Sequence, residues 1–311
     1  MRIHPLVACP GCGSGASGPV DLGGGHELRR CSSCDLVFAA EYGDPDEIYV
    51  DGYLTGATEF GLDIFHPLFQ EFLAYAAAKR LDIIESLRPQ RGSLLDVGCG
   101  SGEVLAVARD RGWQASGAEP VEESAKIARD RGLDVRTALL EDAGFPEASF
   151  DVVAAFHVLE HMAEGVGFLQ LVSRWAKPGG LIVVEMPNWS SFERERTGPD
   201  WPALRPLEHV AHYSPATLRA TMERAGLIPV VVRTTGFLWE RQSLDERLND
   251  LGRSSWRRVL RRLGHTRERH GEAQLVPGPA VSKALLGVQA LYDRLGKGQV
   301  VLGIARVPDR S

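Results

Sequence analysis

Residues 94–102 read Leu-Leu-Asp-Val-Gly-Cys-Gly-Ser-Gly, and a helix-forming run, Glu-Val-Leu-Ala-Val-Ala, follows at 103–108. A short apolar run that meets a glycine-rich turn predicts a strand, a tight turn and a helix. Gly98, Gly100 and Gly102 lack Cβ atoms, so this turn can bring its backbone against a nucleotide-like ligand. Glu103 disfavours a dinucleotide fingerprint, which needs a small residue there, and the Gly-Lys-Ser/Thr of a phosphate-binding P-loop is absent.

Apolar strands and helices alternate along the chain after this turn. Strands are expected at 93–97, 114–119, 134–137, 150–155 and 181–186, with helices at 103–111, 122–130 and 165–176. Continuously apolar strands that alternate with helices predict a parallel sheet covered on both faces, which is the doubly wound α/β class. A helix is expected before the sheet at 67–87. After it we expect a helix at 215–225, a strand at 227–234, a mainly helical stretch at 236–296 and a last strand at 299–307.

The bulk composition is that of an ordinary globular chain. Of its 311 residues, 44% are hydrophobic and 24% are charged. No apolar run approaches the length that spans a bilayer, and Met1–Pro5 lacks the apolar region of a signal peptide, so a cytoplasmic protein is expected. The net charge of −6 argues against a broad nucleic-acid surface, although it leaves room for a local basic patch.

Four of the five cysteines form two C-x-x-C pairs, with 18 residues between the pairs. Two such turns aim four thiolates at one point and predict a tetrahedral zinc site. The predicted ligands are Cys9, Cys12, Cys31 and Cys34. Because all four positions are filled by protein, the zinc would be structural and would hold together a segment too small to fold on its own core. The fifth cysteine, Cys99, is interpreted as a small packing residue in the glycine turn.

The turn from Asp96 to Gly102 also resembles motif I, E/D-x-G-x-G-x-G, of the class I S-adenosylmethionine (SAM) methyltransferases. The runs at 150–153 and 157–161 are typical of members that act on small molecules, and residues 176–181 are similar to the turn before their fifth strand. The likeness covers roughly residues 90–235 and the final strand. It implies a Rossmann-like sheet of seven strands with an antiparallel last strand, and SAM as the cofactor.

Candidate cofactor-binding residues follow the strands, because ligands of doubly wound sheets sit at the carboxyl ends. The cofactor roles of the family fall on Gly98, Gly100 and Gly102, on Glu119, whose carboxylate can accept both ribose hydroxyls, and on Asp142, which can accept the adenine amino group. Glu141 competes with Asp142 for that contact. Asp96 ends the first strand, and Phe156 and His157 are expected near the sulfonium end.

Candidate catalytic residues lie after the fifth strand, in residues 206–213. Ser214 and Pro215 look like the N-cap and first position of a helix, which places this stretch in a loop over the sheet edge. The layout resembles zinc-ribbon methyltransferases of sugar and natural-product pathways, some of which methylate carbon and show Tyr-x-Glu-His. Here Pro206 stands in place of the tyrosine, which favours a hydroxyl acceptor over a carbon acid. His209 is predicted as the general base, oriented by Glu208.

His212 and His157 are alternative bases, and each histidine can instead be a structural loop residue. Seven arginines stand among apolar residues within 253–269, as on an amphipathic helix. They form either a solvated basic face or a site for an anionic acceptor such as a nucleotide sugar.

The predicted organisation is a zinc ribbon (1–45), a helical linker or lid (46–90), a SAM-binding core (91–235), a helical insertion (236–296) and the last core strand (297–311). The predicted activity is SAM-dependent methyl transfer to a small hydroxylated acceptor: a sugar, a nucleotide sugar, a glycan or a secondary metabolite. Alternatives are an RNA or protein methyltransferase that uses the ribbon for recognition, a non-catalytic SAM- or nucleotide-binding module and, more distantly, a nicotinamide dehydrogenase. The sequence leaves the acceptor's identity and the oligomeric state open.

Overall fold

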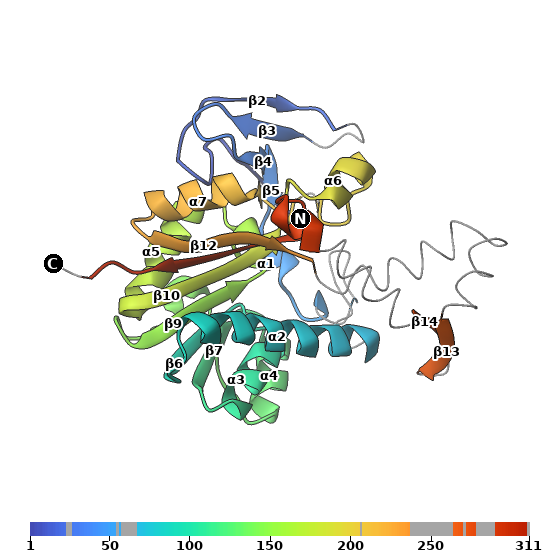
Figure 1. Cartoon of the computed structure of the whole chain (residues 1–311). Helices are drawn as coiled ribbons and strands as arrows, with labels where there is room; N and C mark the ends of the chain where they lie inside the picture. The colour runs from blue at the N-terminus through green and yellow to red at the C-terminus, as the bar shows by residue number, and fades with distance from the viewer. Residues whose placement is uncertain are drawn as a thin grey trace.

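The computed structural model describes residues 1–22, 27–53, 56, 67–205, 207–236, 264–269, 272–277 and 290–309. Its centre is a seven-stranded sheet in the order β12-β15-β10-β9-β6-β7-β8 (Figure 1). The strands are β6 (Ser93–Val97), β7 (Gln114–Glu119), β8 (Asp134–Thr137), β9 (Phe150–Phe156), β10 (Ala176–Pro187), β12 (Ile228–Thr235) and β15 (Val300–Arg306). Strand β15 is antiparallel to both of its neighbours, β10 and β12, while β6 to β10 pair in parallel. The predicted doubly wound sheet with an antiparallel last strand is confirmed.

Helices cover both faces of this sheet (Figure 1). One face carries α2 (Pro67–Leu87), α3 (Glu103–Asp110) and α4 (Glu122–Asp130), and the other carries α5 (Gly165–Trp175) and α7 (Pro215–Arg224). Side chains alternate along each strand, so β10 sends Leu181 and Val183 into the core under α2 and α3 and sends Ile182 and Val184 into the core under α5 and α7. Burial on both faces explains why the strands read as continuous apolar runs.

The N-terminal segment folds into small antiparallel sheets beside the main one. Strand β1 (Ile3–Pro5) pairs with β5 (Glu41–Gly43), and a four-stranded sheet runs β11-β4-β3-β2. Its strands are β2 (Ser17–Val20), β3 (Leu28–Cys31), β4 (Val37–Ala39) and β11 (Ala211–His212). Because β11 belongs to the loop before α7, the N-terminal sheet is completed by a strand from the far part of the chain. A short helix, α1 (Pro45–Ile48), follows β5.

The segment predicted to be mainly helical at 236–296 contains strands. Within its described part, β13 (Gly264–Arg269) pairs antiparallel with β14 (Glu272–Pro277), and only residues 290–294 are helical, followed by a turn. The helical prediction is therefore wrong for residues 264–269 and 272–277. The sequence signal that contradicts it is Gly271, which stands between two six-residue runs with polar and β-branched residues. The rest of the arginine-rich stretch, residues 253–263, lies outside the described residues.

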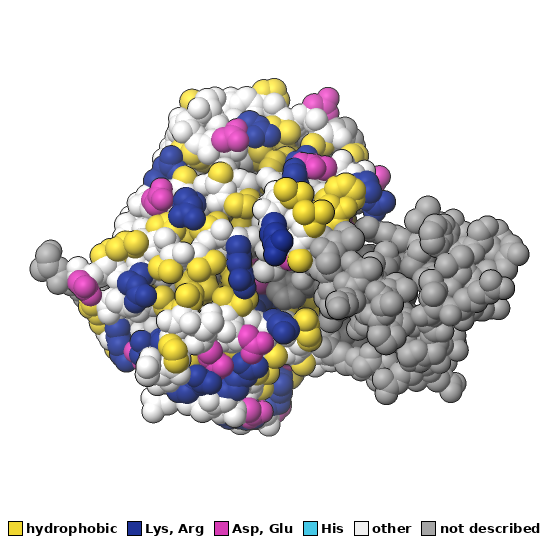
Figure 2. Space-filling model, viewed as in Figure 1, with side chains coloured by type: hydrophobic (Ala, Val, Ile, Leu, Met, Phe, Trp, Pro, Cys, Tyr) yellow, Lys and Arg dark blue, Asp and Glu magenta, His cyan; other side chains and the backbone are white. Residues whose placement is uncertain are grey.

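Two surface properties bear on partners. No helix among the described residues is both long and apolar enough to cross a bilayer. On the face shown in Figure 2, basic and acidic side chains are interspersed rather than segregated. That face therefore offers no broad basic surface of the kind that binds nucleic acid.

Candidate functional site

The glycine turn after β6 has the backbone that its sequence requires. Gly98, Gly100 and Gly102 have φ angles of 68°, 53° and 86°, in the left-handed region that L side chains rarely adopt. A Cβ at Gly98 would lie 2.6 Å from the Val158 side chain, and one at Gly102 would lie 2.5 Å from Leu133. Gly98 and Gly102 are therefore restricted to glycine by both conformation and space, and Gly100 by conformation. The bare backbone of this turn lies at the carboxyl end of the sheet.

Glu119, at the end of β7, is held against this turn. Its carboxylate accepts hydrogen bonds from the backbone N–H groups of Gly100 at 2.9 Å and Val121 at 3.0 Å. Burial raises its pKa, although these two bonds act in the opposite direction. Each oxygen uses one lone pair in these bonds, so a second on each remains to accept hydroxyl groups of a ligand.

Asp96 ends the first strand beside the same turn and is 3% exposed. Its Oδ1 is buried and has no hydrogen-bond partner among the described residues. Burial raises the pKa of Asp96 to about 7, and the nearby Arg80 guanidinium opposes this rise. A buried oxygen without a partner costs free energy, and a donor supplied by a ligand would remove that cost.

The ends of β9 and β10 carry a buried ion pair that the sequence interpretation missed. Arg80 of α2 donates from Nε to Glu185 of β10 at 3.0 Å, and its guanidinium lies 4.3 Å from the centre of the Phe156 ring. Glu185 is a lone acid in the apolar strand run Leu-Ile-Val-Val-Glu-Met, and this interruption is the signal that could have revealed it. The predicted cofactor residue Phe156 is thus fixed under a buried cation.

His157 follows directly and is placed between two carboxylates. Its Nδ1 lies 3.3 Å from Glu160 Oε1 and its Nε2 lies 3.6 Å from Glu185 Oε1. Desolvation lowers its pKa, but hydrogen bonds to Glu160 and Glu185 outweigh this and raise the pKa to about 9. At neutral pH the ring is an imidazolium that has no lone pair for a substrate proton.

His209 has the opposite electrostatic environment. It is buried, and its Nδ1 lies 2.8 Å from the backbone oxygen of Ala203, which can only accept, so Nδ1 carries the proton. Burial lowers the His209 pKa well below its ordinary value, and repulsion from His161 adds to this. His209 is therefore a neutral ring with a lone pair on Nε2. The bond that orients it comes from Ala203, whereas Glu208 was predicted for that role.

Glu208 instead binds a tyrosine and an arginine. Its carboxylate accepts a hydrogen bond from the Tyr53 hydroxyl and pairs with the Arg205 guanidinium at 2.7 Å. A second phenol, Tyr49, lies 2.7 Å from Nδ1 of His161. Both tyrosines were missed, because they belong to an irregular stretch with no periodicity to mark them.

Among the described residues, the side chains of Asp142 and His212 share no hydrogen bond with these groups, although the charge of His212 acts on the pKa of His209. Asp142 is exposed in the 3₁₀ turn η2 (Leu140–Asp142) that follows β8. His212 is buried in β11, with its ring centre 5.3 Å from Trp189 and 6.0 Å from Trp201. Burial lowers the pKa of His212 to about 4, so this ring is also neutral. Its contacts are those of a packing residue under the N-terminal sheet.

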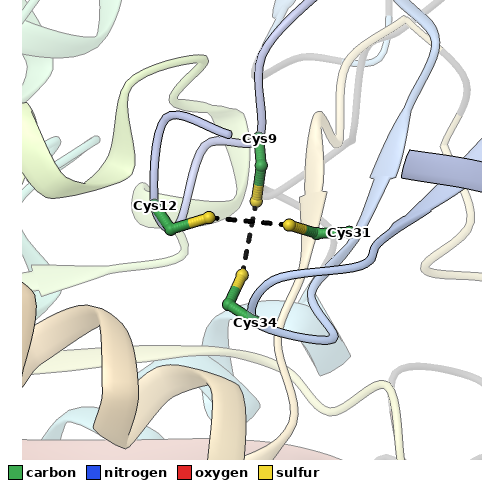
Figure 3. Close-up of side chains that lie close together, drawn as sticks. All are labelled: Cys9, Cys12, Cys31 and Cys34. Atoms are coloured by element: carbon green, nitrogen blue, oxygen red, sulfur yellow. Dashed lines mark hydrogen bonds between the residues drawn. The ribbon is translucent and has the colours of Figure 1, made fainter. Parts of the chain in front are cut away.

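The four predicted zinc ligands converge, as Figure 3 shows. The sulfur of Cys9 lies 3.5 Å from that of Cys34, and Cys12 and Cys31 are likewise 3.5 Å apart. All four Sγ atoms lie within 4.8 Å of one another. Each knuckle turns through a backbone bond to its first cysteine, from Gly13 to Cys9 and from Asp35 to Cys31. Two pairs of thiols at such separations suit one tetrahedral metal ion.

The fold and the glycine turn define a class of nucleoside-binding α/β domains, and comparison with known proteins defines the family. The family model described as "Methyltransferase domain" matches residues 69–231, just over half of the 311-residue chain. The chain belongs to this methyltransferase family.

Individual relatives match just under half of the chain. The chain is 33% identical over 143 residues to a protein named ubiquinone biosynthesis O-methyltransferase from Bradyrhizobium sp. (strain ORS 278), covering 43% of this chain and 54% of that one. It is 31% identical over 135 residues to a probable S-adenosylmethionine-dependent methyltransferase from Mycolicibacterium smegmatis, covering 43% and 51%. The match thus spans about half the length of these curated relatives. A solved structure of a SAM-dependent methyltransferase from Thermotoga maritima, a possible histamine N-methyltransferase, aligns at 17% identity and a TM-score of 0.46, over 79% of this chain and 97% of that one.

Proposed function

We propose that this protein is a SAM-dependent methyltransferase that methylates a hydroxyl group of a small acceptor. The observation that carries this proposal is the glycine turn at Gly98–Gly102 with the Glu119 carboxylate bound to it, in a chain of the methyltransferase family. We also propose the cytoplasm as its compartment, because reducing conditions keep the cysteine cluster available to a metal.

The residues at the sheet edge fit SAM. The bare turn leaves room for an adenosyl group, Glu119 keeps lone pairs for the ribose hydroxyls, and Asp96 offers a buried oxygen that lacks a donor. We keep Asp142 as the acceptor of the adenine amino group and Phe156 and His157 as neighbours of the sulfonium. When bound, SAM supplies a methyl group that is attached to a positively charged sulfur. The leaving group is S-adenosylhomocysteine, in which that sulfur is a neutral thioether.

His209 is the proposed general base. Donation from its Nδ1–H to Ala203 leaves Nε2 free to take the proton of an acceptor hydroxyl while the oxygen attacks the methyl carbon. Its low pKa keeps this lone pair available at neutral pH. The alternative bases are less suited, since His157 is held as a cation and His212 is packed against two indole rings. Glu208, with Tyr53 and Arg205, is proposed to fix the loop that carries the base.

The names of the relatives support oxygen over carbon as the methylated atom. The Bradyrhizobium relative, which is 33% identical over 143 residues, is named as an O-methyltransferase. We propose a sugar, nucleotide sugar, glycan or secondary metabolite as the acceptor. An anionic acceptor would draw on the arginine-rich stretch at 253–269.

We also propose that the cysteine cluster binds a structural zinc ion. Thiolates from Cys9, Cys12, Cys31 and Cys34 fill a tetrahedral shell and leave no position for a substrate. Zinc would stabilise the fold of the N-terminal sheets rather than take part in the reaction.

The test is methyl transfer from isotopically methyl-labelled SAM to a metabolite extract, followed by mass spectrometry. The substitution His209→Asn is expected to lower turnover by about 10²- to 10⁴-fold with SAM affinity unchanged, whereas Glu119→Gln is expected to weaken SAM binding. His4→Gln, at a half-exposed histidine in β1, is the matched control. If neither SAM nor S-adenosylhomocysteine binds the zinc-loaded protein in calorimetry, the proposal is wrong.

A further inference from the structure

A second group of metal-type ligands lies at the carboxyl edge of the sheet, far along the chain from the cysteines. Glu160 and His161 belong to the turn η3 (Leu159–His161) after β9, and His209 comes from the loop before β11. Each offers one ligand atom, and these three atoms lie within 4.8 Å of one another. The backbone N–H of Val210 donates to the Glu160 carbonyl at 2.7 Å, which fixes the two segments together.

Contacts with backbone carbonyls indicate the same tautomer for both imidazoles. The His209 Nδ1 donates to Ala203 O. The His161 Nδ1 lies 3.0 Å from Glu208 O, which can only accept, and 2.7 Å from the Tyr49 hydroxyl, which can accept as well as donate. An unprotonated Nδ1 would set its lone pair against the Glu208 carbonyl, so we place the proton on Nδ1 and the lone pair on Nε2 in both rings. Donation of the other ring N–H to a backbone carbonyl is the arrangement that orients metal-binding histidines. The two rings are 4.7 Å apart, centre to centre.

Glu160 provides an independent sign of a missing partner. It is 2% exposed, and its Oε1 faces His157. Its Oε2 is buried and accepts no hydrogen bond from any described residue. A carboxylate oxygen withdrawn from water without a donor is unfavourable, and a cation would supply what is missing.

We propose that Glu160, His161 and His209 bind a divalent transition-metal cation. Two imidazoles and one carboxylate suit zinc or iron, and binding would draw the three atoms to about 3.5 Å from one another, the edge of a tetrahedron with bonds of roughly 2.1 Å. His161 is half-buried, which gives an ion a path to the site. Three protein ligands leave coordination positions open, so an acceptor hydroxyl could bind there.

This site goes beyond the proposed methyl transfer and would change one part of it. With a cation bound, Nε2 of His209 would be a ligand and not a base. The cation would instead lower the pKa of a bound acceptor hydroxyl, whose proton would pass to solvent water. The proposal concerns ion binding alone, so it can be tested without SAM or an acceptor. Failure of methyl transfer and failure of the metal site are then separate results.

The experiment is a titration with Co²⁺ of protein that holds one zinc ion per chain, enough for the four-cysteine site alone, followed by visible absorption and metal analysis. We expect one Co²⁺ per chain in addition to zinc, with d–d bands but without the sulfur-to-cobalt charge transfer that cysteine ligation would give. Glu160→Gln and His161→Asn are each expected to weaken this binding by about 10-fold or more, while the matched control His4→Gln leaves it unchanged.

Circular dichroism establishes that each variant is folded, and the two ligand variants act as checks on each other. The proposal is overturned if Co²⁺ enters only the cysteine site, as its charge-transfer band would show. It is equally overturned if the folded Glu160→Gln and His161→Asn proteins bind Co²⁺ as tightly as the unmodified chain.

Discussion

Replacing Arg80 by methionine tests how strongly the buried ion pair supports the sheet edge. Arg80 and Glu185 are 8% and 1% exposed, and methionine keeps most of the apolar stem while removing the charge. Breaking a buried pair by removing one partner typically costs about 3–5 kcal/mol, because the other charge is left without compensation. His157, 3.6 Å from Glu185, retains part of that compensation, so we expect the lower end of the range.

The loss of the cation over the Phe156 ring adds to this cost, by about 0.5–2 kcal/mol. A total of about 3–5 kcal/mol corresponds to a fall of roughly 6–20 °C in the thermal midpoint of a domain of this size. The assay is thermal and urea unfolding with zinc in excess, with the urea m-value required to stay constant. Lys126→Met, which breaks the exposed pair with Asp130, is the control and should cost less than about 1 kcal/mol.

The double substitution Arg80→Met with Glu185→Leu separates pairing from packing. If the cost arises from an uncompensated charge, replacing both partners by apolar residues should recover more than half of the lost free energy. A double variant that loses the sum of the single effects would refute this reasoning. So would an Arg80→Met shift no larger than that of Lys126→Met.

Three further predictions concern the turn, the charged histidine and the zinc site. Gly98→Ala should weaken SAM binding by at least about 10-fold in calorimetry. The control is Gly112→Ala, at a glycine with a similar positive φ of 87° but open space around a Cβ, and it should cost only about 1–2 kcal/mol of stability. Equal SAM affinities of the two variants would contradict the assignment of the glycine turn as the SAM site. Because folding raises the His157 pKa from 6.5 to about 9, its contribution to stability should be complete below pH 6.5 and disappear as the pH rises through 9. His157→Gln should therefore reduce the change of the thermal midpoint with pH between 6.5 and 9. An unchanged slope would count against a charged His157. Cys12→Ser should lose bound zinc in metal analysis. It should also alter tryptophan fluorescence, because Trp201 shares a small core with residues of β3 and β4. Unchanged emission would show that this core survives without the metal.

Much of the fold could be predicted because each part of the sheet leaves a local pattern. The strands follow from apolar runs such as 181–186, which are buried on both faces, although β10 itself begins earlier, at Ala176. The start of α7 follows from Ser214 as the N-cap and Pro215 as the first helical residue. The glycine turn was equally readable, since its positive φ angles allow few other residues. The stretch at 264–277 was misread because spacing between arginines was given more weight than the glycine that separates two strands.

The site was only partly predictable, because its chemistry depends on contacts between distant segments. Sequence position places His157 and His209 at the sheet edge, but their opposite protonation has other sources. Contacts with Glu160 and Glu185 raise the His157 pKa, whereas burial and the neighbouring His161 lower the His209 pKa. No motif marks Glu185 as a partner of His157 or His161 as a neighbour of His209. The tyrosines on Glu208 and His161 come from more than 100 residues upstream, so no local pattern could reveal them.

The cysteine knuckles and the loop that carries His209 are far apart in the sequence but are linked by backbone hydrogen bonds in the fold. The carbonyl of Val210 accepts from the N–H of Ala39 in β4 at 2.9 Å, and the N–H of Val210 donates to the carbonyl of Glu160 in η3 at 2.7 Å. The next two residues continue as β11, which pairs with β4. Strand β4 begins three residues after Cys34, so the proposed zinc ion would fix the strand that pairs with β11, next to the His209 loop. We therefore expect this zinc ion to influence the reaction from outside the site, because it would hold the backbone on which the proposed base, or the proposed second cation, depends.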